Sequence, residues 1–318
     1  MINYKIDIPV LLIFFNRDKQ FGQVFEQVKK ARPSKLYLYQ DGAREGNKND
    51  IDGIKKCREI CSDEEINWKC EVHRFYQKKN YGCDPSEFIA QKWMFSTEEM
   101  GIILEDDDVP AQSFFPFCKE LLEKYKDDER IHMICGMNNY DINIDTEYSY
   151  FFSKRGAIWG WASWRRVLDT WDETYSFLDD RDALRLLKEN EKNQKEYDNI
   201  ISICKRHKAS GRAHYESING ISRRLYGRVN IVPKYNMITN IGLTNESTHS
   251  VSNIHQLPKE TQKLFQKKAF EIEFPLKHPK YIMVDQKYDK KYYNSTFKKY
   301  ILKIESIVRR CWFYRRKK

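Results

Sequence analysis

Over its first 135 residues the chain alternates short apolar segments with longer amphipathic ones. The apolar segments are 8–15, 35–41, 69–76, 101–106 and 131–135, and the amphipathic segments between them are 18–31, 50–61, 84–98 and 113–125. Strands and helices that alternate in this way build an open sheet with helices on both faces, because each helix carries the chain back to the start of the next strand. The sequence therefore predicts an α/β, Rossmann-like fold with a mixed, mostly parallel sheet flanked by helices.

Polar residues follow three of the predicted strands, at the point where each strand ends. They are Asn16 and Arg17 after the first strand, Asp41 and Gly42 after the second, and residues 105–108 after the fourth. Ligands of such sheets bind beyond the carboxyl ends of the strands. The three loops are therefore expected to meet around one ligand.

The last of these loops contains four consecutive acids, Glu105, Asp106, Asp107 and Asp108. Carboxylates this close repel one another unless a cation or a set of helix-terminal amides compensates their charge. A helix cap formed by Asp108 or Ser113 is one explanation, but a cap accounts for one or two acids and not for four. Hard carboxylates favour magnesium or manganese, which complete their coordination shell with phosphate oxygens and water. The acids are therefore expected to bind a metal–diphosphate complex.

The second half of the chain is less regular. Residues 155–171 begin as a loop rich in Gly and Trp and continue as a helix, residues 180–209 and 214–227 read as helices, and residues 229–233 read as a strand. The segment 236–250 ends in a polar loop. We find no repeat and no low-complexity linker, so one two-part domain is expected rather than two independent ones.

Positive charge is concentrated at the end of the chain. The net charge is +10, of which residues 298–318 carry +8 with nine Lys or Arg and one acid, so residues 1–297 carry about +2. A nucleic-acid-binding domain usually has a basic face, so no nucleic-acid partner is expected. Apolar residues recur at helical spacing over 295–313, which indicates either an interfacial helix attracted to an anionic membrane surface or a last helix packed on the domain.

The cysteines and the first residues bear on the cellular compartment. Eight Cys residues are scattered without the C-x-x-C spacing of a zinc site, so reduced thiols and a reducing compartment are expected. The apolar segment 8–15 is too short for a membrane span and lacks the layout of a signal peptide. The sequence therefore predicts a cytoplasmic protein, and the basic tail would hold it peripherally at the inner face of the cell membrane.

The segment GIILEDDDVPAQSFF, residues 101–115, resembles the Asp-x-Asp region of nucleotide-sugar glycosyltransferases with the GT-A fold. It is most similar to the Glu-Asp-Asp form of N-acetylglucosaminyltransferase-I-like enzymes and of bacterial relatives from polysaccharide clusters. The resemblance covers most of residues 8–250 and includes PVLLIFFNR, YQDGAR, NYG, WGWASWRR and IVPKYNMITNIG followed by STHS, in the order of the family. It implies a GT-A fold and a nucleotide-sugar donor.

The resemblance assigns several residues to the donor. Arg17 stands where a nucleotide-contacting arginine is expected, and Asp41 is placed to accept a hydrogen bond from the base. The loop from Asn80 to Gly82 matches one that approaches the nucleotide. The tryptophans of WGWASWRR could stack on sugar faces or fill the core, and Trp161 is assigned to the donor.

The resemblance also implies a metal, manganese or magnesium. Asp107 matches its direct ligand, and Asp106 and Glu105 would hold the ribose, the base or metal-bound water. Asp108 stands where an apolar residue is commoner, and no role follows for it. His249 in the polar loop is assigned to the metal, although a single loop histidine is also typical of a solvated side chain.

The activity that the resemblance implies is a metal-dependent, inverting transfer of a sugar from a nucleotide-diphosphate donor, expected to be a UDP-sugar, to an acceptor hydroxyl. Such a transfer needs a general base. Glu216 in AHYESI stands where the family places Trp-Asp at the start of a late helix, so it is the candidate base. An acid in a first helical turn is also favoured by the helix dipole alone. The acceptor would be a glycan or lipid-linked glycan of a surface polysaccharide.

On this interpretation residues 1–135 form the nucleotide-sugar-binding half, residues 136–255 the acceptor and catalytic half, and residues 256–318 a C-terminal extension with the basic helix. Two other functions stay open. A glycoside hydrolase with paired carboxylates explains the acids and the aromatic residues but not the nucleotide-type sheet. A non-catalytic protein that binds anionic lipid or nucleic acid explains only the basic tail.

Overall fold

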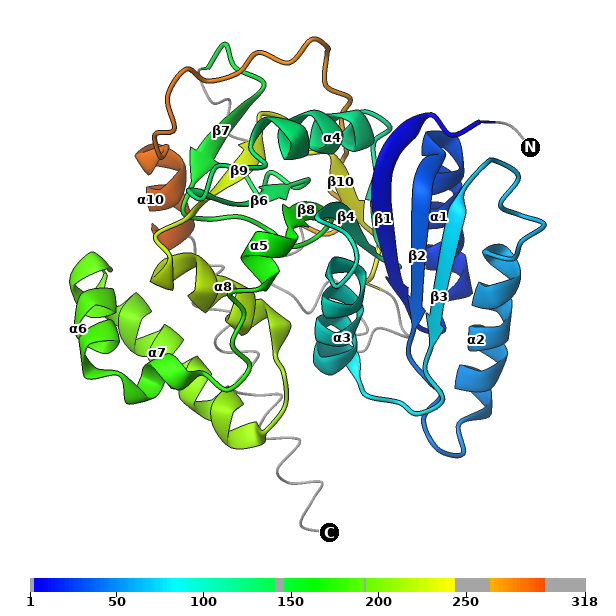
Figure 1. The fold of residues 1–318 in the computed structure, drawn as a ribbon, viewed down its shortest axis with the longest axis horizontal. Helices are drawn as coiled ribbons and strands as arrows, with labels where there is room; N and C mark the ends of the chain where they lie inside the picture. Colours follow the sequence, from blue (N-terminus) through cyan, green and yellow to red (C-terminus); the bar gives the residue numbers. More distant parts are fainter. Residues whose placement is uncertain (1–2, 141–145, 192, 244–263, 295–318) are drawn as a thin grey trace.

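The computed structural model describes residues 3–140, 146–191, 193–243 and 264–294, and Figure 1 shows their arrangement. Eight strands form one sheet in the order β3-β2-β1-β4-β8-β6-β9-β7. The bounds are β1 Ile6–Phe14, β2 Pro33–Gln40, β3 Glu71–Tyr76, β4 Met100–Glu105, β6 Ile131–Cys135, β7 Tyr150–Ser153, β8 Trp161–Trp164 and β9 Val229–Pro233. Strands β7 and β8 are antiparallel to their neighbours, and the other six are parallel to one another. The predicted mixed, mostly parallel sheet is confirmed.

Helices flank this sheet (Figure 1). They are α1 Asp18–Ala31, α2 Lys48–Ile60, α3 Cys83–Phe95, α4 Phe114–Lys124, α5 Arg165–Leu168, α6 Arg181–Asn190, α7 Gln194–Ser210, α8 Tyr215–Leu225 and α10 Gln286–Asn294, with a 3₁₀ turn at Ser176–Asp179. In α1 the residues at helical spacing, Phe21, Val24, Phe25 and Val28, are at most 1% exposed. Helix α3 packs on β1, β2 and β4 and on α8, whereas α4 packs on β1, β4, β6 and β8.

The five strands and four helices predicted for the first 135 residues are all present, with ends that differ by at most three residues. Local periodicity was sufficient there because each segment is long enough to bury one face or both. The ends of β1 and β4 lie side by side, since Ile13 pairs with Glu105. Gln40 at the end of β2 pairs with Phe14. The three polar strand ends therefore share one edge of the sheet.

Two predictions for the second half were wrong in part. The segment after Gly160 was expected to be helical, but Trp161–Trp164 form β8, which inserts between β4 and β6 and is followed by the four-residue helix α5. Its residues are all buried, so contacts on both sides of the strand outweigh its local preference. Residues 180–209 form two helices, because Asn193 caps α7 by accepting from the N–H groups of Lys195 and Glu196.

A second, two-stranded antiparallel sheet joins β5, Asp108–Pro110, to β10, Ile238–Asn240. Asp108 is therefore a strand residue and does not cap the next helix. Ser113 occupies the N-cap position of α4, but its side chain makes no cap and instead accepts from the N–H of Ile272. The helix-cap explanation of the four acids is thus excluded for Asp108.

Some predictions fall on residues that the structure does not describe. These are the amphipathic helix over 295–313, the loop with His249, and Cys311. The other seven cysteines are free thiols. Within the described ranges we find no helix with the length and apolar character needed to cross a membrane.

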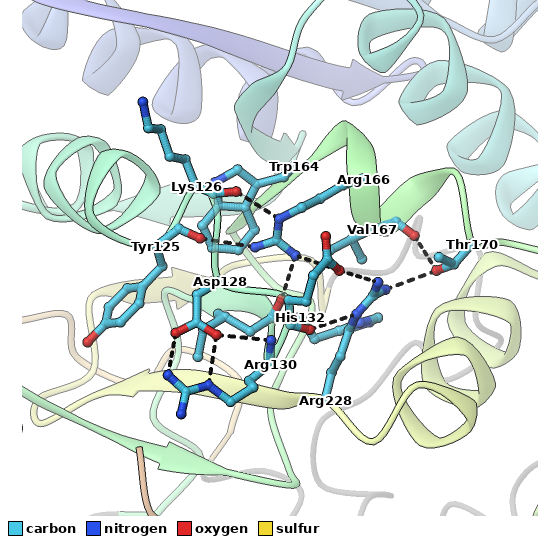
Figure 2. Close-up of polar contacts among 12 residues, drawn as sticks. Tyr125, Lys126, Asp128, Arg130, His132, Trp164, Arg166, Val167, Thr170 and Arg228 are labelled. Atoms are coloured by element: carbon cyan, nitrogen blue, oxygen red, sulfur yellow. Dashed lines mark hydrogen bonds and ion pairs between the residues drawn. The ribbon is translucent and has the colours of Figure 1, made fainter. Parts of the chain in front are cut away.

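Arg166 in α5 holds the loop that leads into β6 (Figure 2). Its guanidinium donates to the carbonyl oxygens of Lys126 at 2.9 Å, Tyr125 at 3.1 Å and Ile131 at 3.1 Å. It also lies over the ring of Trp164, 4.5 Å from the centroid. One side chain thus satisfies three loop carbonyls and fixes where β6 begins.

Replacing Arg166 by Met is expected to lower the free energy of unfolding by about 2–4 kcal/mol, because three carbonyls lose a charged donor. Urea denaturation measures this change. The matched control is Arg185→Met, since Arg185 is exposed and, among the described residues, its ion pairs are with its helical neighbours Asp182 and Glu189. That variant should stay within about 0.5 kcal/mol of the wild type. Equal losses in the two variants would refute the anchoring role of Arg166.

Candidate functional site

Arg17 joins the end of β1 to the acids at the end of β4. Its Nε is 3.2 Å from Asp106 Oδ2, and its Nη2 contacts Asp106 Oδ1 and lies 2.8 Å from Asp107 Oδ2. The N–H of Phe15 points at the same Asp106 oxygen, at 3.4 Å. The predicted meeting of these two strand ends is therefore present, and Arg17 partly offsets the acidic charge.

The pKa values of Arg17, Glu105 and Asp108 are shifted by burial and by the crowding of the acids. Burial lowers the pKa of Arg17, but Asp106 and Asp107 outweigh it and raise the pKa above its ordinary value. Burial raises the pKa of Glu105 well above its usual range, and so do the carboxylates of Glu87 and Asp108. Asp108 shifts in the same direction, first through burial and then through Asp107. Glu105 and Asp108 thus ionise less readily than exposed carboxyl groups, while Asp106 and Asp107 share the guanidinium of Arg17.

The donor set at Asp107 fits a hard divalent cation. Asp107 is 7% exposed, and its Oδ1 accepts from Asn240 Nδ2 at 3.0 Å. Magnesium and manganese take one or two protein carboxylates and complete their shell with phosphate and water. In the described part of the chain no group of three or more His, Cys, Asp or Glu side chains could hold a metal ion.

Gly242 lies directly against Asp107, after β10. A Cβ atom at position 242 would stand 1.9 Å from Asp107 Oδ2 and 2.7 Å from its Cγ. The N–H of Gly242 donates to Asn240 Oδ1 at 3.0 Å, and Asn240 Nδ2 donates in turn to Asp107. Only glycine lets the backbone approach this carboxylate so closely. Asn240 and Gly242 thus position Asp107. The sequence predicted no role for either residue, although both belong to the motif IVPKYNMITNIG.

Asp108, for which the sequence predicted no role, connects three parts of the site. One carboxylate oxygen accepts from the N–H of Gly160 at 2.8 Å, and the other accepts from Asn240 Nδ2 at 3.1 Å. Asp108 is fully buried. Its carboxyl group therefore holds the segment before β8 and the end of β10 against the acidic loop.

Asp41, Asn80 and Gly82 come together as predicted, but in a different role for Asp41. Its carboxylate accepts from the N–H groups of Gly42, Tyr81 and Gly82 at 2.9–3.2 Å and from Asn80 Nδ2 at 2.9 Å. Gly82 has φ +86° and serves as the N-cap of α3. Asp41 thus fastens the loop in front of α3, and its oxygens are already engaged within the chain rather than open to a base.

Tyr215 links the first turn of α8 to the acidic loop. Its hydroxyl donates to Glu105 Oε1 at 3.2 Å, and the side chain is 2% exposed. Burial raises the pKa of Glu87 in α3 well above its ordinary value, and the charge of Glu216 adds to this. Glu216 itself is exposed. The candidate base therefore lies in the first turn of α8, next to Tyr215, which contacts Glu105 at the end of β4.

Glu216 also lines a cavity of about 310 Å³, together with His132, Trp159, Arg223 and Asn230. The ring of Trp159 is partly exposed there and packs on Phe265, with 5.0 Å between centroids. The cavity thus offers one carboxylate, one aromatic face and several polar side chains to a ligand.

Trp161, which was assigned to the donor, is 1% exposed and lies inside the sheet in β8. Its ring has no surface on which a sugar could stack in this conformation, so it fills the core. Trp159 was one of the three tryptophans predicted either to stack on a sugar or to fill the core, but the assignment went to Trp161, because spacing alone does not tell which ring faces inward.

His132 in β6 is expected to make the stability depend on pH. Its side chain is 1% exposed, and burial, followed by the charge of Arg223, lowers its pKa to about 3. Between that value and the ordinary histidine pKa of about 6.5, only the unfolded chain binds this proton. The contribution of neutral His132 to the free energy of unfolding is complete above pH 6.5. It falls by roughly 1.4 kcal/mol for each pH unit below that value.

Urea denaturation of the wild type and of His132→Gln between pH 5 and pH 8 checks this expectation. The difference in unfolding free energy between the two proteins should shrink as the pH falls, since the variant lacks the titrating ring. A difference that stays constant over this range would show that His132 does not titrate as inferred.

No family model and no curated protein matches the chain. Among solved structures it is similar to an apo UDP-glucose pyrophosphorylase, with 10% identity over 74% of this chain and 93% of that one and a TM-score of 0.34. A UDP-glucose pyrophosphorylase complexed with UDP-glucose gives 11% identity, 73% and 90% coverage and a TM-score of 0.36. The chain is also similar to the 4-diphosphocytidyl-2C-methyl-D-erythritol synthase of Anaerococcus prevotii, with 8% identity over 62% of this chain and 84% of that one and a TM-score of 0.30. Similarity at this level does not establish a shared activity.

Proposed function

We propose that this protein is a metal-dependent, inverting glycosyltransferase that moves a sugar from a nucleotide-diphosphate donor to a glycan hydroxyl. The observation that carries the proposal is the convergence of Arg17, Asp106 and Asp107 at the carboxyl edge of the sheet, with Glu216 nearby on the wall of a cavity. Nucleotide ligands of open α/β sheets bind at this edge. Residues 1–135 would hold the donor, and residues 136–255 the acceptor.

In this proposal Asp107 holds the cation, and Asn240 and Gly242 keep its carboxylate in place. Manganese or magnesium at this position supplies Lewis-acid stabilisation of the charge that develops on the leaving diphosphate. Arg17 is released from part of its pairing with Asp106 and Asp107 and turns its guanidinium towards the nucleotide. Arg17 is suited to this because a guanidinium binds phosphate oxygens through two parallel hydrogen bonds.

Glu216 would act on the acceptor. Its exposed carboxylate borders the cavity, where an acceptor hydroxyl can reach it. As that oxygen attacks the anomeric carbon, Glu216 takes the hydroxyl proton, and the bond from the anomeric carbon to the diphosphate breaks on the opposite face. Attack from the opposite face inverts the configuration of the anomeric carbon. Tyr215 and Glu105 would fix the distance between this base and the donor end of the site.

The acceptor would be a glycan or lipid-linked glycan of a surface polysaccharide, with a UDP-sugar as donor. The basic tail, residues 298–318, would hold the protein at the anionic inner face of the cell membrane. These assignments rest on the resemblance of the sequence motifs and on the charge of the tail.

The test is release of nucleotide diphosphate from UDP-, GDP- and dTDP-sugars in the presence of oligosaccharide acceptors, with and without manganese. We expect nucleotide diphosphate to be released only when both a donor and an acceptor are present, and we expect a metal chelator to stop this release. Release of free sugar from a glycan without any nucleotide donor would instead identify a glycoside hydrolase. Binding to anionic vesicles with no turnover of any donor would identify a non-catalytic protein.

A further inference from the structure

The cavity bordered by Glu216 is basic. Among the described residues that line it, Lys154, Arg155, Arg223 and Arg224 are cationic and Glu216 is the acid. It is built by β6, β9 and α8 and by the segment that follows β7. Its charge is therefore opposite in sign to that of the acidic loop at the end of β4.

Two of the four cations are offset by acids that do not line the cavity. Arg155 binds both carboxylate oxygens of Glu196, with Nη2 2.8 Å from Oε2. Arg224 Nη2 lies 3.2 Å from Glu196 Oε1, and its Nε is 3.8 Å from Glu191 Oε2. These pairs fix both side chains, so their guanidinium groups form a rigid wall.

Arg223 differs from its neighbours. It is 7% exposed, and its Nη1 donates to the carbonyl of Arg228 at 3.2 Å. No carboxylate of the described residues forms an ion pair with it. Burial, followed by the charges of Arg224 and Arg155, holds the pKa of Arg223 well below its usual range. Asp289 and Glu191 act in the opposite sense but do not outweigh these effects, so Arg223 stands in a positive potential that an anionic ligand would relieve.

Two side chains that line the same cavity, His132 and Asn230, each have a buried acceptor atom without a donor in the described chain. His132 Nε2 lies 2.6 Å from Asn219 Oδ1, so Nε2 carries the proton and Nδ1 is left as an acceptor. His132 Nδ1 and Asn230 Oδ1 have no hydrogen-bond partner in the described chain, and the two side chains are 1% and 2% exposed. Buried acceptors without donors are costly, so ligand hydroxyl groups are their natural complement.

We propose that this cavity binds an acidic sugar unit of the acceptor, with its anionic group on Arg223 and its hydroxyl groups beside the polar side chains of His132 and Asn230. The inference rests on the proposed function for the identity of the ligand as an acceptor. The anionic group is a carboxylate or a phosphate, since both are oxyanions that a guanidinium binds. Glu216 stands at the cavity, so a hydroxyl of the same or the adjoining unit reaches the base.

The experiment uses ligand-observed NMR to measure the binding of glucuronic acid, glucose 6-phosphate and glucose to the full-length protein. At least one of the two anionic sugars should bind 10-fold or more tightly than glucose, and the tighter one identifies carboxylate or phosphate as the anionic group. Equal binding of all three sugars by the wild type would overturn the inference, and this comparison needs no variant.

Variants then locate the binding. Arg223→Gln should weaken the favoured anionic sugar at least 10-fold and leave glucose unchanged, whereas Arg223→Lys should keep most of the preference. Arg185→Gln is the control for a lost surface arginine. If Arg223→Gln were folded and bound the anionic sugar as the wild type does, the inference would be wrong.

A parallel titration with UDP, GDP and dTDP in the presence of manganese separates this inference from the proposed function. Arg223→Gln should bind the nucleotide as the wild type does, and Asp107→Asn should keep the anionic sugar while losing the nucleotide. If Arg223→Gln abolished nucleotide binding, the cavity would belong to the donor, and the acceptor inference would fail. If no nucleotide bound while the anionic sugar did, the proposed transferase would fail and the anion site would stand.

Discussion

Replacing Asp107 by Asn is expected to slow the release of nucleotide diphosphate by about 1,000-fold, because a cation on this carboxylate stabilises the leaving group. Asn keeps the size of the side chain and an oxygen that can accept from Asn240 Nδ2. The variant loses the ion pair with Arg17 but also one of several crowded negative charges, and these effects oppose each other, so its free energy of unfolding should change little. Loss of activity without loss of stability is the signature of a functional carboxylate.

Gly242→Ala tests the same site without touching a charge. The added Cβ would stand 1.9 Å from Asp107 Oδ2, so the carboxylate or the backbone has to move. A displacement of this size costs roughly 100-fold in rate when geometry matters. Gly22→Ala is the matched control, because the nearest atom to its added Cβ is Ile60 Cδ1 at 3.7 Å.

Asp52→Asn, an exposed acid of α2, is the control for the charge change. If Asp107→Asn kept wild-type turnover and manganese dependence, the metal site would have to be sought elsewhere. Activity in Gly242→Ala equal to that in Gly22→Ala would show that the contact with Asp107 is not needed.

The sequence could predict the donor end of the site because its parts follow local rules. Strands β1, β2 and β4 each bury an apolar segment, and polar residues come where the segment ends, so Arg17 and the acids had to meet at one edge. The strand β8 could not be predicted in this way. Its four residues are buried by β4 on one side and β6 on the other, and neither neighbour is near in sequence.

The contacts that position the acids were also beyond the sequence. Asn240 and Asp107 are 133 positions apart, and nothing in either segment indicates that one amide reaches two carboxylates. Asp41 shows the converse case. Its place at the end of β2 was predicted, but the hydrogen bonds that engage its oxygens come from a loop 39–41 positions later. The positions of these side chains at the strand ends followed from the periodicity of the sequence, whereas their roles depended on long-range packing.

Replacing Glu216 by Gln is expected to lower turnover by about 100- to 10,000-fold, because the amide cannot accept the proton of the attacking hydroxyl. Binding of the nucleotide with manganese should be unchanged, since Glu216 lies on the cavity and Asp107 on the acidic loop. The acidic limb of the pH–rate profile, which reports protonation of the base, should disappear in the variant. Initial rates and nucleotide titrations measure these three effects.

The same variant decides between the two explanations of Glu216 that its sequence position allows. An acid favoured only by the dipole of α8 would lose about 0.3–1 kcal/mol of stability on conversion to Gln and would leave turnover intact. A base would lose turnover at nearly unchanged stability. Glu216→Asp sharpens the comparison, because the shorter carboxylate keeps the dipole interaction but withdraws the base, so partial turnover with full stability supports catalysis. Glu189 is an exposed acid of α6, and the variant Glu189→Gln is the control that measures the effect of removing a surface charge.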